Sequence, residues 1–165
     1  MTIDEALLKY NNISQKSKVI FPEFVKQASV TLTNEMGKKN EYFSNEEAIF
    51  ISIHNVFSTL SKDIKIGIRL SDRLNNAVFN LSPILTKDGI IDIDFSKNQF
   101  STEIPAYTLN AGFYTVDLVY FDNENVINEI KNINYFKIKL AERFMTGNML
   151  GEDGVLMPFY TWEIK

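Results

Sequence analysis

Few residues in this chain could do chemistry of the catalytic or metal-binding kind. His54 is the only histidine and there is no cysteine, which excludes a multi-histidine metal site, a thiolate zinc site, a disulfide and a cysteine nucleophile. A serine–histidine–aspartate triad would depend on His54 alone. His54 has the opposite phase to Ile49, Ile51 and Ile53, so we expect it on the surface of a sheet. The phosphate-binding pattern G-x-x-x-x-G-K-[ST] does not occur.

Asp92 and Asp94 are the best candidates for a pair of catalytic carboxylates. Residues i and i+2 of a strand share a face about 6.5–7 Å apart, which overlaps the carboxylate spacing of inverting glycosidases. Nothing in the sequence buries either acid, and two acids on the solvated side of one strand are the ordinary result of alternation. We therefore expect solvated side chains here and no catalytic centre.

The acidic and amide residues at 122–125 could suggest a calcium loop. They lack the D-x-[DN]-x-[DN]-G frame that such a loop requires. Asp and Asn favour turns and helix starts, so we interpret the segment as a turn that leads into a short helical connection over 124–131.

Composition favours one globular domain that does not bind nucleic acid. The chain has 165 residues, of which 45% are hydrophobic, enough to fill a sizeable core. The formal net charge is −4, whereas a nucleic-acid-binding domain normally carries a basic face. No apolar run is long enough to span a membrane, and the first residues lack the pattern of a secretory signal. If the chain is complete, we expect it in the cytoplasm.

From residue 25 onward the apolar residues recur with a period of two. The alternating runs are interrupted by turn signals such as Lys87-Asp88-Gly89 and Asp153-Gly154. The pattern predicts an all-β fold, an immunoglobulin-like antiparallel β-sandwich of seven to nine strands. We assign residues 1–24 to a linker or N-terminal arm and 25–165 to the sandwich domain. The clearest runs are 29–33, 48–54, 64–70, 91–95, 114–120, 136–139 and 155–164.

The stretch Leu109-Asn110-Ala111-Gly112-Phe113-Tyr114 is the most informative local feature. A Tyr two residues after a turn glycine, at the start of an alternating strand, is typical of the tyrosine corner of immunoglobulin-like sandwiches. Its hydroxyl would bond the turn backbone while the ring enters the core. A core Tyr without that bond would serve the same fold.

Four stretches, taken in order along the chain, form a combined pattern. The first is Phe43-Ser44-Asn45-Glu46-Glu47 with the isoleucine strand after it. The others are Ile64-Lys65-Ile66-Gly67-Ile68 with Asn76-Ala77-Val78-Phe79-Asn80, then Ile104-Pro105 with Leu109-x-x-Gly112-x-Tyr114, and last Tyr135-Phe136-Lys137-Ile138 with Pro158 and Trp162. In this order they resemble the family of Wzt C-terminal domains, which bind exported O-polysaccharide and are fused to the ATPase domain of an ABC transporter. Asn45 stands where this family usually has Gly, which is tolerable because Asn accepts a left-handed turn.

The resemblance implies a non-enzymatic domain without cofactor that binds bacterial O-polysaccharide, near a modified non-reducing end. It also implies a homodimer, partner ATPase and membrane subunits, and a place in the cytoplasm at the inner face of the inner membrane. A fibronectin-like domain that binds proteins instead of carbohydrate remains the alternative, because one sandwich serves many functions.

Sugar sites combine aromatic faces with planar polar side chains. The outward side of the strands around 64–70, 113–121 and 135–139 offers such a mixture, and Gly67 would leave room there for a ligand to approach. We expect Arg69 and Asp117 to project into solvent on this side. The predicted carbohydrate-binding residues are Lys65, Arg69, Thr115, Asp117, Tyr135 and Lys137, with Tyr160 and Trp162 as further aromatic candidates.

The two-residue period stops between residues 140 and 153 and returns in the final run at 155–164. A terminal strand on a long tether can cross to a second subunit, because exchange of an identical element is a low-cost route to a dimer. It would also cover an open sheet edge. The alternative is a strand that folds back onto its own sandwich.

Overall fold

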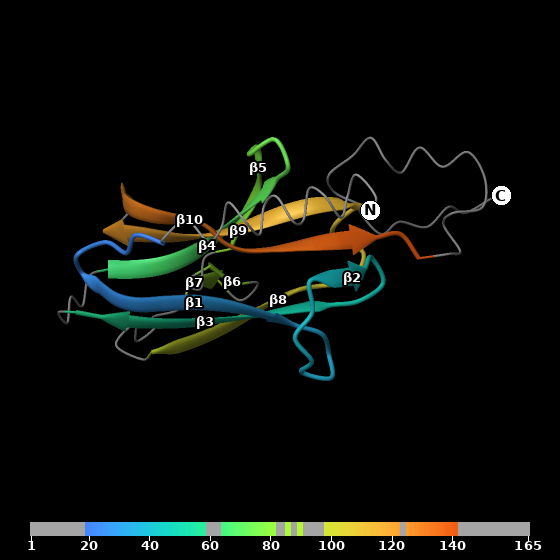
Figure 1. Ribbon diagram of the computed structural model, residues 1–165, viewed down its shortest axis with the longest axis horizontal. Helices are drawn as coiled ribbons and strands as arrows, with labels where there is room; N and C mark the ends of the chain where they lie inside the picture. The colour runs from blue at the N-terminus through green and yellow to red at the C-terminus, as the bar shows by residue number, and fades with distance from the viewer. Residues whose placement is uncertain are drawn as a thin grey trace.

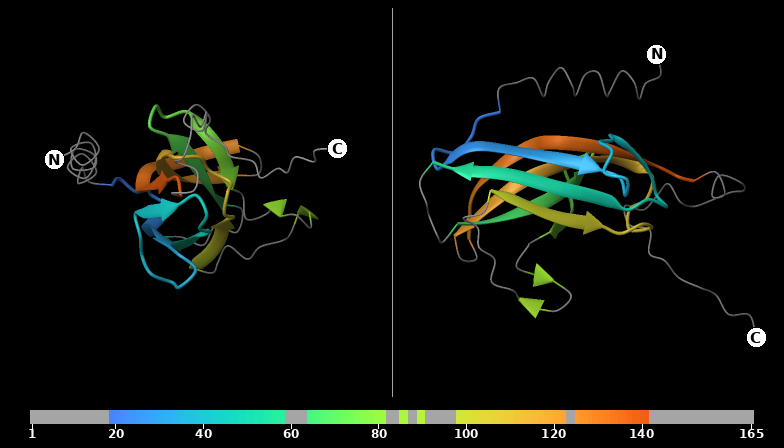
Figure 2. Two further views of the ribbon diagram at one scale, coloured as in Figure 1. Left: turned by 90° about the vertical axis from the view of Figure 1, so that its right-hand side faces the viewer. Right: turned by 90° about the horizontal axis from the view of Figure 1, so that it is seen from below.

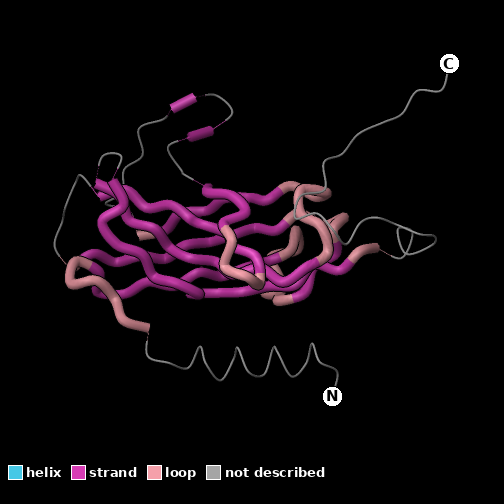
Figure 3. Tube along the Cα trace, turned by 90° about the horizontal axis from the view of Figure 1, so that it is seen from above, coloured by secondary structure: helices cyan, strands magenta, loops and turns pink. Residues whose placement is uncertain are grey.

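The computed structural model describes residues 19–58, 64–81, 85–86, 89–90, 98–122 and 125–141. Every regular element in these residues is a β-strand (Figure 3). None of them forms a helix that is long and apolar enough to cross a bilayer. The segments 1–18, 91–97 and 142–165, which include the predicted strands at 91–95 and 155–164, lie outside the described residues.

Two sheets face each other and form a sandwich (Figures 1 and 2), which confirms the predicted fold class. A three-stranded sheet has the order β1-β3-β8, a five-stranded sheet has the order β2-β10-β9-β4-β5, and β6 and β7 form a separate two-stranded ribbon. All described pairs are antiparallel except β2 with β10. The strands are β1 (Val25–Thr33), β2 (Tyr42–Ser44), β3 (Ile49–Phe57), β4 (Ile64–Asp72), β5 (Ala77–Leu81), β6 (Leu85–Thr86), β7 (Gly89–Ile90), β8 (Gln99–Ile104), β9 (Gly112–Asp122) and β10 (Asn125–Lys139).

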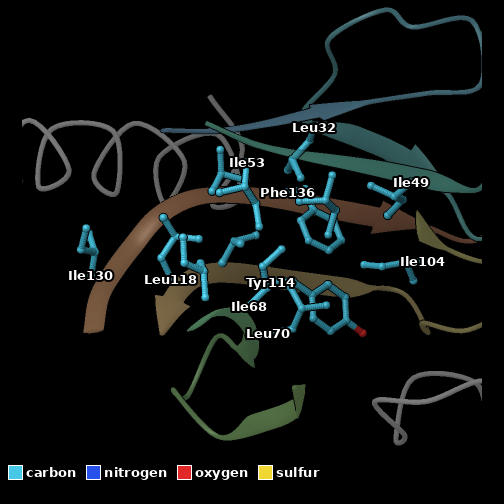
Figure 4. Packing of buried hydrophobic residues seen from close by; sticks show 14 of the residues in the cluster. Leu32, Ile49, Ile53, Ile68, Leu70, Ile104, Tyr114, Leu118, Ile130 and Phe136 are labelled. Atoms are coloured by element: carbon cyan, nitrogen blue, oxygen red, sulfur yellow. The ribbon is translucent and has the colours of Figure 1, made fainter. Parts of the chain in front are cut away.

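The core lies between the two sheets and is built from the alternating residues of each strand. In β3 the residues Ile49, Ile51 and Ile53 are buried, and they meet the inward residues of β4, β9 and β10 (Figure 4). In β1, β3, β4 and β9, the alternate residues that the sequence predicted to share one apolar face are therefore the residues that pack in the core. Because successive side chains of a strand point to opposite faces, the same pattern fixes which residues face outward.

The tyrosine corner is present at the start of β9. The hydroxyl of Tyr114 donates to the backbone carbonyl of Asn110 at 2.9 Å, and both residues are buried. The ring stacks on Phe136 of β10, with 5.4 Å between the ring centroids. Burial raises the pKa of the Tyr114 phenol to about 12, so the hydroxyl stays a donor at any physiological pH.

The helix predicted over 124–131 is wrong, since residues 125–131 form the first half of β10. Its register against β9 shifts twice, between Val126 and Asn128 and again between Ile130 and Asn134. Bulges of this kind interrupt the two-residue period, which removed the strand signal from the sequence. Val126 and Ile127 are consequently both exposed.

Asn45 does not use the left-handed conformation that an Asn in place of Gly can accept. The non-glycine residues with positive φ in the described segments are Asn75, Tyr107 and Asn132. Asn45 is buried instead, and its side-chain oxygen accepts the backbone N–H of Ala141 at 2.8 Å. An Asn at this position therefore ties the end of β10 to the turn after β2.

We predict that Tyr114→Phe lowers the free energy of unfolding by about 1–3 kcal/mol, because the buried carbonyl of Asn110 loses its donor. Urea unfolding followed by fluorescence measures this change. Tyr42→Phe, which removes an exposed hydroxyl, is the control and should change stability by less than about 0.5 kcal/mol. Equal effects of the two substitutions would show that the corner does not stabilise the fold.

Candidate functional site

The structure brings six of the predicted site residues onto one surface, the side of the five-stranded sheet that faces away from the core. We call this surface the outer face. Cross-strand register places Arg69 of β4 opposite Asp117 of β9, and Thr115 of β9 opposite Tyr135 of β10. The remaining two are Lys65 of β4, opposite Phe121, and Lys137 of β10, opposite Phe113.

Arg69 is the centre of a polar network that runs across the outer face. Its Nη1 donates to Oε2 of Glu129 at 2.8 Å, and its Nε donates to Oδ1 of Asn80 at 3.3 Å. Lys131 pairs with the other oxygen of Glu129 at 3.0 Å. The guanidinium therefore links β5, β4 and β10, and its side chain is 28% exposed. A ligand could reach it, but would meet an arginine that is already held in position.

Asp117 does not project into solvent, contrary to the expectation from alternation. It is 6% exposed, and its Oδ1 accepts the backbone N–H of Asn132 at 2.7 Å. Asn132 has a φ of 52° at the second register shift of β10. Burial raises the pKa of the Asp117 carboxyl, the Asn132 N–H opposes that shift, and the charge of Glu129 adds to it. The Asp117 carboxylate thus stabilises the bulge of β10, and its main role is structural.

Two further predicted residues are also less accessible than expected. Tyr135 is 4% exposed, and its ring stacks on Phe113 with 5.7 Å between centroids. The hydroxyl oxygen of Thr115 is buried and has no hydrogen-bond partner in the described part of the chain. Of the six, Lys65, Arg69 and Lys137 are the partly exposed ones with long polar side chains.

Gly67 does not leave an open position for a ligand. It is buried, and a Cβ at this position would lie 3.0 Å from a ring carbon of Phe121 and 3.1 Å from the carbonyl oxygen of Leu81. The aromatic ring covers the glycine, in the way that aromatic neighbours compensate for glycines in sheets. The space is therefore needed for packing between β4, β9 and β5.

Sequence reasoning missed two aromatic residues of the outer face. Phe113 is partly exposed above Tyr135, and Tyr42 of β2 is 38% exposed at the edge of the sheet. The ammonium of Lys139 lies 5.0 Å from the centroid of the Tyr42 ring. Phe113 could have been found from its phase, which is that of Thr115. Tyr42 belongs to a strand of three residues, too short for a periodic signal.

The remaining candidates do not join this surface. His54 lies on β3 of the other sheet, between Ser29 and Gln99, and is partly exposed. Tyr160, Trp162, Asp92 and Asp94 lie outside the described residues. In the segments that the structure describes, no group of three His, Cys, Asp or Glu side chains could hold a metal ion.

Comparison with solved structures identifies the architecture. A crystal structure of the C-terminal domain of Wzt matches with a TM-score of 0.63 and 12% sequence identity, and the match covers 84% of each chain. The chain has the fold of the Wzt C-terminal domain. An FMN-binding beta-glucuronidase from Facaelibacterium prausnitzii L2-6 matches with a TM-score of 0.37 over 67% of this chain and 15% of that one, too low to carry an argument. No family model and no curated protein matches the sequence.

The raised pKa of Asp117 predicts how stability depends on pH. The unfolded chain releases this proton at lower pH than the folded chain does, so stability present at low pH is lost as the pH rises through both values. Asp117→Asn keeps an oxygen for the Asn132 N–H and removes the charge. The variant should therefore gain stability relative to the parent as the pH rises above about 4, the ordinary pKa of an Asp.

Two further variants make this measurement specific. Asp117→Ala removes the acceptor as well, and should cost about 1–3 kcal/mol at every pH. Glu103→Gln removes an exposed carboxylate from the other sheet and controls for the change in net charge. Chemical unfolding at several pH values gives the four curves. A constant difference between the parent and Asp117→Asn would contradict the prediction.

Proposed function

We propose that this chain binds bacterial O-antigen polysaccharide as the substrate-recognition domain of an ABC-transporter ATPase. The observation that carries the proposal is the match with the Wzt C-terminal domain, which extends over most of both chains. We further infer that the domain is not itself an enzyme, works in the cytoplasm beside the inner membrane, and acts together with an ATPase domain and membrane subunits. Its sequence has no phosphate-binding loop of the ATPase type.

The outer face has the chemistry that a glycan requires. Phe113 offers a partly exposed ring opposite Lys137. The guanidinium of Arg69, held by Glu129, lies farther along the same face, and Lys65 lies beyond it, opposite Phe121. An aromatic face covers the apolar C–H side of a pyranose, and charged donors bond its hydroxyls or an acidic substituent. We place the polysaccharide across β10, β9 and β4, with Tyr135, Thr115 and Asp117 supporting the residues that make contact.

Isothermal titration calorimetry with O-polysaccharide released from the bacterium that carries the gene tests this placement. We expect Lys137→Ala and Phe113→Leu each to weaken binding about 3- to 10-fold, because one loses a charged donor and the other a ring face. Lys26→Ala, on β1 of the other sheet, is the matched control and should leave affinity unchanged. Unchanged affinity in both outer-face variants would show that the site lies elsewhere on the domain. No binding by the parent would refute the proposed polysaccharide-binding function.

We also propose that the domain is a homodimer in which the segment at 155–164 pairs with a sheet edge of the partner. The described sandwich leaves β1 and β8 at the two edges of the three-stranded sheet and β5 at one edge of the other. Unpaired edges favour association with further strands, and exchange of a terminal strand closes a twofold dimer.

Deletion of residues 154–165 should then convert the dimer into a monomer or an aggregate. Size-exclusion chromatography with light scattering measures the mass of the intact and shortened chains. An intact chain that is a monomer at tens of micromolar would rule out exchange. A shortened chain that remains a dimer would place the interface in the sandwich itself.

A further inference from the structure

We call the side of the sandwich on which β1 lies near β2 and β10 the open side. It contains a groove that is separate from the middle of the outer face. The groove has a volume of about 450 Å³ and is lined by residues 30–32 of β1, the segment 39–42 that leads into β2, and Asn134 of β10. This volume lies in the range of small-molecule sites in proteins. The lining is mostly polar, so the groove is unlike the apolar core between the two sheets.

Two residues of β1, Val30 and Leu32, direct their backbone N–H and carbonyl groups toward this groove. On β3, the N–H of Asn55 bonds the carbonyl of Asn98 at 2.9 Å, so the odd-numbered residues of β3 direct their backbone groups to β8. Val30 and Leu32 of β1 lie opposite two of these odd-numbered residues, Ile53 and Ile51. They therefore form the pairs that are not hydrogen-bonded between β1 and β3. Their N–H and carbonyl groups point away from the sheet, into the groove.

The two carbonyls are occupied and the two N–H groups are not. Nδ2 of Asn134 donates to the carbonyl oxygen of Val30 at 2.8 Å, and the backbone N–H of Asn40 donates to that of Leu32 at 3.2 Å. In the described segments, the N–H groups of Val30 and Leu32 have no such partner. A further strand would have to bond both the N–H and the carbonyl groups of this edge. Because the two carbonyls already accept hydrogen bonds, this part of β1 disfavours the addition of a strand. It suits a discrete ligand with acceptor oxygens.

Tyr42 gives the groove an aromatic wall with a fixed orientation. Lys139 lies over the Tyr42 ring, and Oδ1 of Asn40 accepts the backbone N–H of Tyr42 at 3.2 Å and that of Glu41 at 3.0 Å. An exposed ring beside amide and ammonium groups is a combination that packs against a pyranose and bonds its hydroxyls.

We propose that this groove binds one sugar residue of the polysaccharide, with hydroxyl or ring oxygens accepting from the N–H groups of Val30 and Leu32 and a C–H face against Tyr42. The proposal rests on the proposed function and adds a second contact to it. Tyr42 lies opposite Lys137 across β2 and β10, so the groove is continuous with the outer face. A polysaccharide could cross the sheet and end, or turn, over its β2 edge.

Titration of ¹⁵N-labelled protein with the same O-polysaccharide, followed by amide NMR spectra, tests the proposal. We expect the amide signals of Val30 and Leu32 to shift together with those of the outer face. Tyr42→Ala should weaken binding about 3- to 10-fold in calorimetry, whereas Tyr42→Phe, which keeps the ring, should stay within about twofold of the parent.

The outcomes separate the two proposals. Shifts on the outer face without shifts at Val30 and Leu32, or an unchanged affinity of Tyr42→Ala, would overturn the groove and leave the proposed function standing. Shifts at these two amides that disappear in Tyr42→Ala and persist in Tyr42→Phe would support it. The absence of any shift in the spectrum would overturn both.

Discussion

The hydrogen bond from the backbone N–H of Asn132 to the carboxylate of Asp117 fixes the point at which β10 changes register against β9. From Ile130 to Asn134 the chain advances four residues, while the paired residues of β9 advance only two, from Leu118 to Val116. The excess of two residues is even, so apolar residues face the core on both sides of the shift. The same shift directs Asn134 to β1, where its amide joins the two sheets at the open side. Core, outer face and groove therefore all depend on one bulge and on the buried acid that holds it.

The strands with an uninterrupted two-residue period could be predicted from the sequence, because β3, β4 and most of β9 each bury one face completely. The tyrosine corner could be predicted as well, since it depends on local spacing alone. The first half of β10 could not. Its strand character comes from pairing with β9, while its own pattern is broken by two register shifts. β8 gave a weak signal for a related reason, because it is an edge strand with exposed alternate residues. Of the others, only Ile104 is buried, while Phe100 and Thr102 are partly buried.

The outer face was predicted correctly as a set of positions and incorrectly as a set of exposed side chains. The two-residue period predicts which face of the sheet a side chain lies on. It does not predict which side chains of neighbouring strands cover it. Phe121 covers Gly67, Phe113 stacks on Tyr135, and Asp117 is buried beside the Arg69 network. Each of these depends on a neighbour in another strand, at a distance in sequence that no local pattern reports. In the proposed site, the residues left to contact a glycan are consequently the long cations with Phe113 and Tyr42, whereas Asp117 has a structural role.

The polar capping of β1 also limits where a second subunit can attach. Strand addition at Val30 and Leu32 would have to displace the amide of Asn134 and the N–H of Asn40 from the two carbonyls that they occupy. A displaced amide at this partly buried position would lose a hydrogen bond worth about 1 kcal/mol, and the link between the sheets with it. An exchanged strand therefore has more to gain at β8, the opposite edge of the same sheet. In the proposed dimer, β8 would then be the edge that receives the partner strand. The β1 edge, with its two N–H donors and Tyr42, would be left for the proposed sugar.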